Sequence, residues 1–105
     1  MMIEFLSAAA QEASDAAAHY EACVPGLGSE FTAELERVAN LLSGYSAAGA
    51  PLDEKHRRIP LNRFPYALIY SIDVSVVRIV AVTHRRRSPA YWYPRVQDRE
   101  DAAYA

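Results

Sequence analysis

The sequence predicts an α+β fold in which two helices lie on one face of a β-sheet. The chain has 105 residues, a length typical of one domain with a single core. Its first half is dominated by helical patterns and its second half by strand-like runs. Helices followed by strands along the chain indicate α+β architecture. We expect the order β-α-α-β-β-β in one domain over residues 1–105, with a polar tail from about residue 97.

A short strand and a first helix are predicted at the start. Residues 3–6 alternate weakly between apolar and polar side chains, as a strand does. Ser7 is a candidate N-cap for the segment that follows. Residues 8–23 are rich in alanine and contain no proline or glycine, which favours a helix. The sequence Pro25-Gly26-Leu27-Gly28 then breaks the chain.

A second helix is predicted over residues 27–45, where apolar residues recur every three or four positions and draw one stripe. The small-residue stretch 46–51 ends it. We expect this stripe to be buried against the sheet. The helix residues concerned are Leu27, Phe31, Leu35, Val38 and Leu42, and their expected partners are Leu68, Tyr70, Ile79 and Ala81.

Three strands are predicted in the second half. Ile59 and Leu61 alternate with polar residues and Pro60, and a proline restricts a strand to an edge or a bulge. Residues 66–72 form the next run. Residues 76–83 are apolar on both faces, as expected of a central strand. The intervening residues 73–75 are few enough for a hairpin.

The charge is unevenly distributed along the chain. Residues 1–54 hold nine acids and one base, whereas residues 55–105 hold ten bases and four acids, which gives −8 and +6. Such a basic half can face a polyanion or an acidic partner. Alternatively, the acids occupy solvated helix faces and the arginines flank strands.

Composition argues against several other classes. The single cysteine, Cys23, excludes an internal disulfide framework, and its spacing from His19 supplies only two metal ligands. We therefore predict no metal and no cofactor. No apolar run approaches the roughly 20 residues of a membrane span. We expect a cytoplasmic protein without a membrane partner.

The densest chemistry lies in residues 84–95, His84-Arg85-Arg86-Arg87-Ser88-Pro89-Ala90-Tyr91-Trp92-Tyr93-Pro94-Arg95. Arginine forks bind phosphates bidentately, and aromatic side chains stack on exposed bases. This combination suits single-stranded RNA, and three further arginines could extend the patch: Arg57, Arg58 and Arg63. The alternative is a solvated terminus whose aromatic side chains fold back to close the core.

Taken together, four stretches resemble the RelE/ParE superfamily of bacterial type II toxins over about residues 3–95. They are residues 25–28 followed by Phe31, then Arg57-Arg58-Ile59-Pro60-Leu61, then Arg63-Phe64-Pro65-Tyr66-Ala67-Leu68-Ile69-Tyr70, then residues 79–87 with Tyr91-Trp92 behind them. The resemblance implies a helical hairpin packed on a small twisted antiparallel sheet. It also implies a cognate antitoxin, and hence a toxin–antitoxin hetero-oligomer.

The resemblance offers two activities. RelE-like members cut mRNA in the ribosomal A site, and ParE-like members poison DNA gyrase. Arg58 matches one basic residue of the RNase branch, and Arg85 with Tyr91 matches its strand-end pair. Pro60 stands where the RNase branch has a second basic residue, and Ala67 stands where that branch has an arginine after Tyr66. A metal-free RNase needs cations and a proton-transfer group, so these losses favour ParE-like inhibition of gyrase.

The resulting expectation is a gyrase inhibitor without catalysis of its own, with a metal-independent, ribosome-dependent mRNA endonuclease as the alternative. A non-toxic antitoxin-binding module remains the third reading. The expected target-binding residues are Arg85, Arg86, Arg87, Tyr91 and Trp92. In an RNase, Arg85 and Tyr91 would be catalytic, with Arg58 as an accessory. We expect the antitoxin to cover the helical hairpin and part of the basic sheet with an acidic segment.

Overall fold

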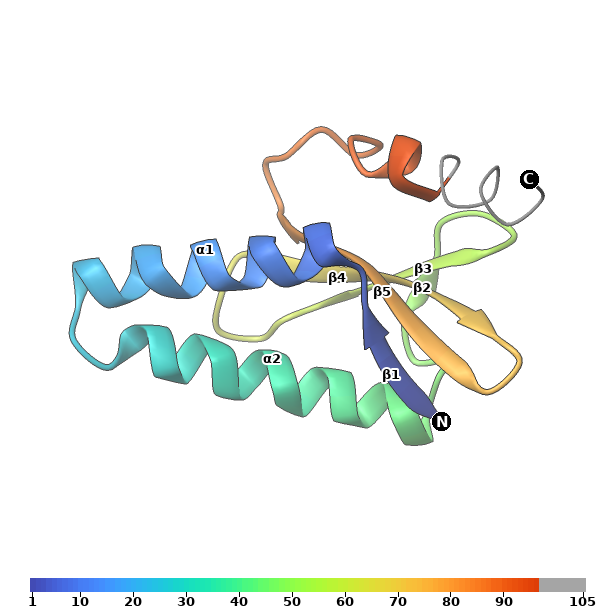
Figure 1. Cartoon of the computed structure of the whole chain (residues 1–105), viewed down its shortest axis with the longest axis horizontal. Helices are drawn as coiled ribbons and strands as arrows, with labels where there is room; N and C mark the ends of the chain where they lie inside the picture. Colours follow the sequence, from blue (N-terminus) through green and yellow to red (C-terminus); the bar gives the residue numbers. More distant parts are fainter. Residues whose placement is uncertain (97–105) are drawn as a thin grey trace.

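The computed structural model describes residues 1–96, and Figure 1 shows two helices beside one twisted sheet. The polar tail expected from residue 97 lies outside the described residues. The elements are β1 (Met2–Phe5), α1 (Ser7–Cys23), α2 (Leu27–Gly44), β2 (Ala50–Pro51), β3 (His56–Pro60), β4 (Tyr66–Asp73) and β5 (Val76–His84). The predicted order is confirmed, with one addition: the two-residue strand β2 forms within the loop expected at residues 46–51. Ser7 is not the N-cap of α1: the cap residue is Leu6, and the helix start has no side-chain capping hydrogen bond.

The five strands form one sheet in the order β1-β5-β4-β3-β2. Neighbouring strands from β2 to β5 are antiparallel, as expected. β1 instead runs parallel to β5, so the sheet is mixed at this edge. Parallel pairing needs a long connection between the strands, and here the whole helical hairpin and three strands separate them.

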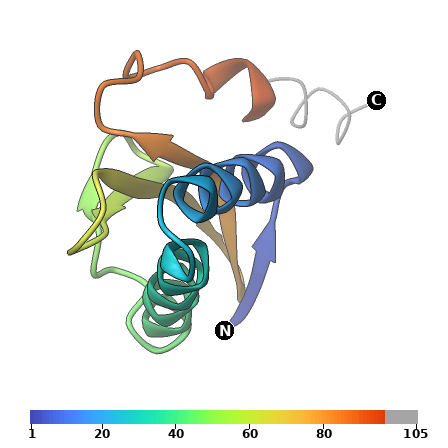
Figure 2. The same cartoon turned by 90° about the vertical axis from the view of Figure 1, so that its left-hand side faces the viewer.

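The helical hairpin buries its apolar stripe against one face of the sheet. Figure 2 shows α1 and α2 side by side, viewed nearly along their axes. The helix residues Phe31, Leu35, Val38 and Leu42 are all buried and share one cluster with Leu68, Tyr70 and Ile79, as predicted. Leu27 is only partly buried at the start of α2.

Ala81 does not join that cluster. The pairing of β4 with β5 shifts register between Ile69 and Tyr70. Ile69 faces Ala81 and Tyr70 faces Ile79, so Val80 has no partner in β4 and forms a bulge in β5. This bulge interrupts the alternation of side chains. Ala81 therefore belongs to a second cluster with Ile69, Val80, Trp92 and Val96, and its predicted contact with the helices is wrong.

The turn between the helices depends on two glycines. Gly26 has a φ of +89°, a left-handed conformation that glycine adopts without strain. At Gly28 a β-carbon would collide with the carbonyl oxygen of Ala17, so only glycine lets the helices approach this closely. The Glu21 carboxylate accepts hydrogen bonds from the N–H groups of Gly26 at 2.7 Å and Gly28 at 3.0 Å. It thereby satisfies free donors at the start of α2.

Candidate functional site

A hollow of about 410 Å³ opens at the end of the sheet where β3 ends, β4 begins and β5 ends. Arginines from three segments line it: Arg58 from β3, Arg63 from the loop before β4, and Arg85 immediately after β5. Strand pairing brings these segments together, because Pro60 faces Ala67 and Tyr66 faces His84. The remaining lining residues are Pro60, Leu61, Asn62, Phe64, Pro65 and Tyr66.

The rim of this arginine hollow is held by carboxylates of α2. Glu34 is 7% exposed and accepts hydrogen bonds from the backbone N–H groups of Asn62 at 2.6 Å and Arg63 at 3.1 Å. Glu30 forms an ion pair with Arg63 at 2.9 Å, but both side chains are more than half exposed, so this pair contributes little stability. The backbone N–H of Arg85 donates to the carbonyl of Pro65 at 2.9 Å. The loop is therefore fixed from the helical layer and from β5.

Two of the three arginines that line the hollow, Arg58 and Arg85, form no ion pair with the described residues, whereas Arg63 is paired with Glu30. In the part of the chain that the structure describes, the arginines that form ion pairs are Arg63, Arg78 and Arg95. Arg58 and Arg85 have no acidic partner among residues 1–96, and neither does the exposed Arg86 that follows. Two unpaired guanidinium groups in one concave site form a candidate anion-binding site.

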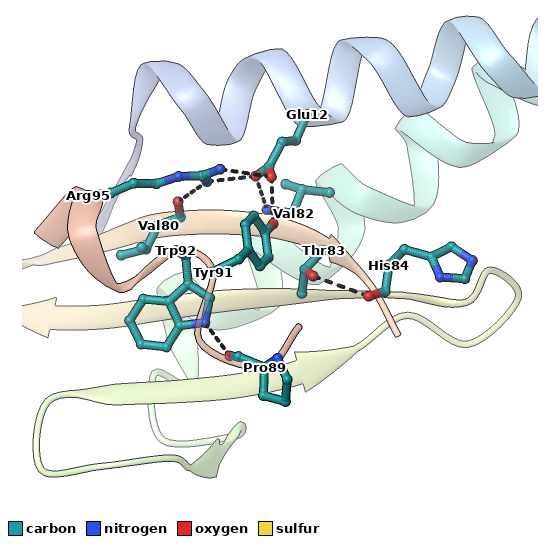
Figure 3. A network of polar contacts seen from close by, with 9 residues as sticks. All are labelled: Glu12, Val80, Val82, Thr83, His84, Pro89, Tyr91, Trp92 and Arg95. Atoms are coloured by element: carbon teal, nitrogen blue, oxygen red, sulfur yellow. Dashed lines mark hydrogen bonds and ion pairs between the residues drawn. The ribbon is translucent and has the colours of Figure 1, made fainter. Parts of the chain in front are cut away.

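Tyr91 does not line the hollow. Its hydroxyl donates to Glu12 Oε2 at 2.5 Å, and the same carboxylate accepts bonds from Arg95 and from the N–H of Val82 (Figure 3). Burial and the hydrogen bond to Glu12 raise the pKa of the Tyr91 hydroxyl. The Arg87 guanidinium lies 4.3 Å from the Tyr91 ring centroid. The structure thus brings Arg58 and Arg85 together and ties Tyr91 to α1.

Trp92 is a core residue. Its side chain belongs to the second cluster of buried residues, it is 4% exposed, and its Nε1 donates to the carbonyl of Pro89 at 3.0 Å (Figure 3). The centroid of its ring lies 4.8 Å from the ring centroid of His56. Trp92 is among the expected target-binding residues, but its aromatic side chain folds back onto the sheet because the bulged part of β5 presents apolar surface there, and its role in target binding stays a prediction.

Sequence reasoning missed Glu12, Glu34 and Arg95 as positioning residues. Glu34 lies off the apolar stripe of α2 and reads as a solvated acid, and no local pattern links Glu12 to a residue near the other end of the chain. Within residues 1–96 no group of three or more His, Cys, Asp or Glu side chains is placed to hold a metal ion. Across the same range, none of the helices combines the length and apolar character needed to cross a bilayer.

The helical hairpin packed on a mostly antiparallel five-stranded sheet is consistent with the fold of the RelE/ParE superfamily. Residues 3–89 match the family described as the ParE toxin of the type II toxin–antitoxin system, parDE, and the chain belongs to this family. Its fold is shared with a solved structure titled "Chromosomal ParDE TA system from P. aeruginosa", at a TM-score of 0.70 and 16% identity. That match covers 80% of this chain and 95% of the other. No curated protein matches the sequence.

Proposed function

We propose that this chain is a toxin that inhibits DNA gyrase by binding and is silenced by a cognate antitoxin. The observation that carries this proposal is the separation of Tyr91 from the arginine hollow. The hollow supplies cations for binding, whereas the hydroxyl that an endonuclease would use is held by Glu12. Membership of the ParE toxin family supports the same assignment.

The residues around the hollow support binding more than cleavage. Cutting RNA without a metal requires a group that moves a proton and cations that stabilise the transition-state phosphate. Pro60 lines the hollow at the position where the RNase branch has a basic residue. Ala67 stands where an arginine is expected, and it is fully buried. Neither residue can donate or accept a proton through its side chain. Binding to a target, unlike cleavage of RNA, requires no proton-transfer group, and the arginines supply the charge for it.

One observation favours the endonuclease as the second candidate. Arg58 and Arg85, the two cations that match the RNase branch, line the same hollow. Purified toxin assayed in parallel against gyrase supercoiling and ribosome-programmed mRNA cleavage separates the two activities. Loss of supercoiling with intact mRNA supports the proposal. Cleaved mRNA with unaffected supercoiling contradicts it.

The antitoxin is proposed to carry an acidic segment that reaches the basic part of the sheet. The solved neighbour is titled as a ParDE system, and the second half of this chain carries a charge of +6. Charge steering of this kind weakens as salt screens it. Antitoxin affinity should therefore fall with ionic strength, and an affinity unchanged by salt would contradict the charge-based part of the proposal.

Induction of the gene without its antitoxin tests toxicity itself. Growth arrest supports a toxin. Unimpaired growth with soluble, folded protein in the cells supports the non-toxic antitoxin-binding module instead.

A further inference from the structure

We infer that the arginine hollow binds the phosphodiester backbone of duplex DNA, so that the toxin contacts the DNA on which gyrase acts as well as the enzyme. The role at gyrase rests on the proposed function. The binding itself rests on the charge, shape and rigidity of the hollow.

The positive charge at the hollow is a local feature. The whole chain carries a net charge of −2, so general attraction to polyanions does not explain a nucleic-acid role. Arg58 and Arg85 nevertheless share one concavity without an acid partner in residues 1–96, while Arg63 is drawn to Glu30. Packing gives no reason to hold two unpaired guanidinium groups together. A phosphate group, which accepts the paired N–H donors of arginine, would balance them.

The cations continue beyond the hollow. Arg86 follows Arg85 directly, is exposed, and directs its backbone N–H to His84 Nδ1 at 3.1 Å, which fixes the turn at this point. A succession of cations fits a ligand whose negative charges repeat along a chain. Each strand of a DNA duplex carries one phosphate about every 3.4 Å. We therefore favour a nucleic-acid backbone over the carboxylates of an acidic protein.

Duplex DNA fits this site better than single-stranded RNA. Single strands are held largely by bases that stack on exposed aromatic rings. Trp92 is buried in the core, and the Tyr91 ring is covered by Arg87 and Arg95, whose guanidinium carbons lie 4.3 Å and 5.0 Å from its centroid. Two aromatic rings line the hollow: Phe64 is 7% exposed and packs on Phe31, and the partly buried Tyr66 packs edge-on against Phe31 and His84. Arginines beside rings that are already packed against neighbouring side chains suit contacts to phosphates more than stacking on bases.

The site is also organised before any ligand arrives. The buried Glu34 holds the backbone of the loop at Asn62 and Arg63, and Pro65 is tied to the N–H of Arg85. A fixed rim lowers the cost of ordering the arginines on binding.

Fluorescence anisotropy of a short labelled DNA duplex, titrated with the purified full-length toxin between about 50 and 200 mM salt, tests the inference. We expect Arg58→Ala and Arg85→Ala each to weaken binding roughly tenfold, the effect of losing a charge-assisted hydrogen bond. Each should also lower the slope of log affinity against log salt by about 1. Arg37→Ala is the matched control, because Arg37 is an exposed arginine of α2 outside the hollow, and it should bind as the wild type does.

Circular dichroism and thermal unfolding confirm that each variant is folded. No binding of the duplex by wild type, or equal binding by all variants, would overturn the inference. Tighter hollow-dependent binding of single-stranded RNA or of polyglutamate would also overturn it. Gyrase inhibition is measured separately: a toxin that inhibits gyrase without binding DNA overturns only this inference. A toxin that binds DNA through the hollow but leaves gyrase active contradicts the proposed function instead.

Discussion

Arg95 donates two parallel hydrogen bonds to the carboxylate of Glu12, from Nη1 to Oε1 at 2.9 Å and from Nη2 to Oε2 at 3.0 Å. This fork joins α1 to the segment that follows β5, across 83 residues of sequence. The same carboxylate accepts the Tyr91 hydroxyl and the N–H of Val82, just after the bulge in β5. Glu12 therefore fixes the segment that places Trp92 in the second cluster, with Ile69 and Val80.

Replacing Glu12 with glutamine should destabilise the fold. The substitution removes a charge that is 20% exposed, and the amide nitrogen cannot accept the bonds that Arg95 and Tyr91 donate. Losing charge-assisted hydrogen bonds of this kind costs about 1–3 kcal/mol in the free energy of unfolding. Urea denaturation measures the loss. Glu36→Gln, an exposed position on α2, is the control and should change the free energy little.

The same carboxylate should make stability depend on acidity. Burial alone would raise the pKa of Glu12, but hydrogen bonds from Arg95, Tyr91 and Val82 outweigh it and hold the pKa below the ordinary value of 4.5. A lowered folded pKa contributes stability above the unfolded value, and this stability is lost as the pH falls through the folded value. Thermal unfolding from pH 7 downward should show this loss beginning near the ordinary value. Glu12→Gln should show less of it, and an unchanged pH profile in that variant would contradict the assignment.

Removing the indole of Trp92 should lower the free energy of unfolding. Truncating a buried aromatic side chain costs about 3–5 kcal/mol, and Trp92 is 4% exposed. Its neighbour Tyr93 is 43% exposed, so Tyr93→Ala serves as the matched control with a much smaller expected effect. The comparison is made by chemical denaturation. If Trp92→Ala proved as stable as wild type yet abolished growth arrest, Trp92 would be a target anchor after all.

Two variants distinguish inhibition of gyrase by binding from cleavage of mRNA in the cell. Tyr91→Phe removes only the hydroxyl that donates to Glu12, so it should leave growth arrest nearly intact in a gyrase inhibitor. Arg85→Ala removes a cation from the hollow and should relieve growth arrest. Colony counts after induction, normalised to toxin level, measure both. Detoxification by Tyr91→Phe at normal protein levels would point to proton transfer, and hence to the endonuclease.

Much of the fold is predictable because its patterns are local. The stripe through Phe31, Leu35 and Leu42 follows the helical period and is buried as predicted. The parallel pairing of β1 with β5 is not local, since nothing near Ile3 specifies a partner more than seventy residues away. The bulge at Val80 is equally hidden, because an apolar run on both faces carries no alternation that an extra residue would visibly break.

Two of the residues expected at the site lie together in the structure, and their role stays a prediction. Arg85 could be singled out by its place after a central strand and Arg58 by its match to the RNase branch, and the structure puts both in one hollow. The role of Trp92 could not be assigned, because an exposed anchor and a core residue have the same local sequence. Its burial depends on Glu12 and Arg95 holding the segment in place, and that contact exists only after folding.

Supercoiling of relaxed plasmid by purified gyrase, with increasing toxin, tests the central claim most directly. We predict that wild-type toxin suppresses supercoiling, that antitoxin restores it, and that the double variant Arg58→Ala, Arg85→Ala is much weaker at equal concentration. The Arg37→Ala variant should inhibit as the wild type does, since Arg37 lies outside the hollow. Full supercoiling at every concentration of folded wild-type toxin would contradict the account.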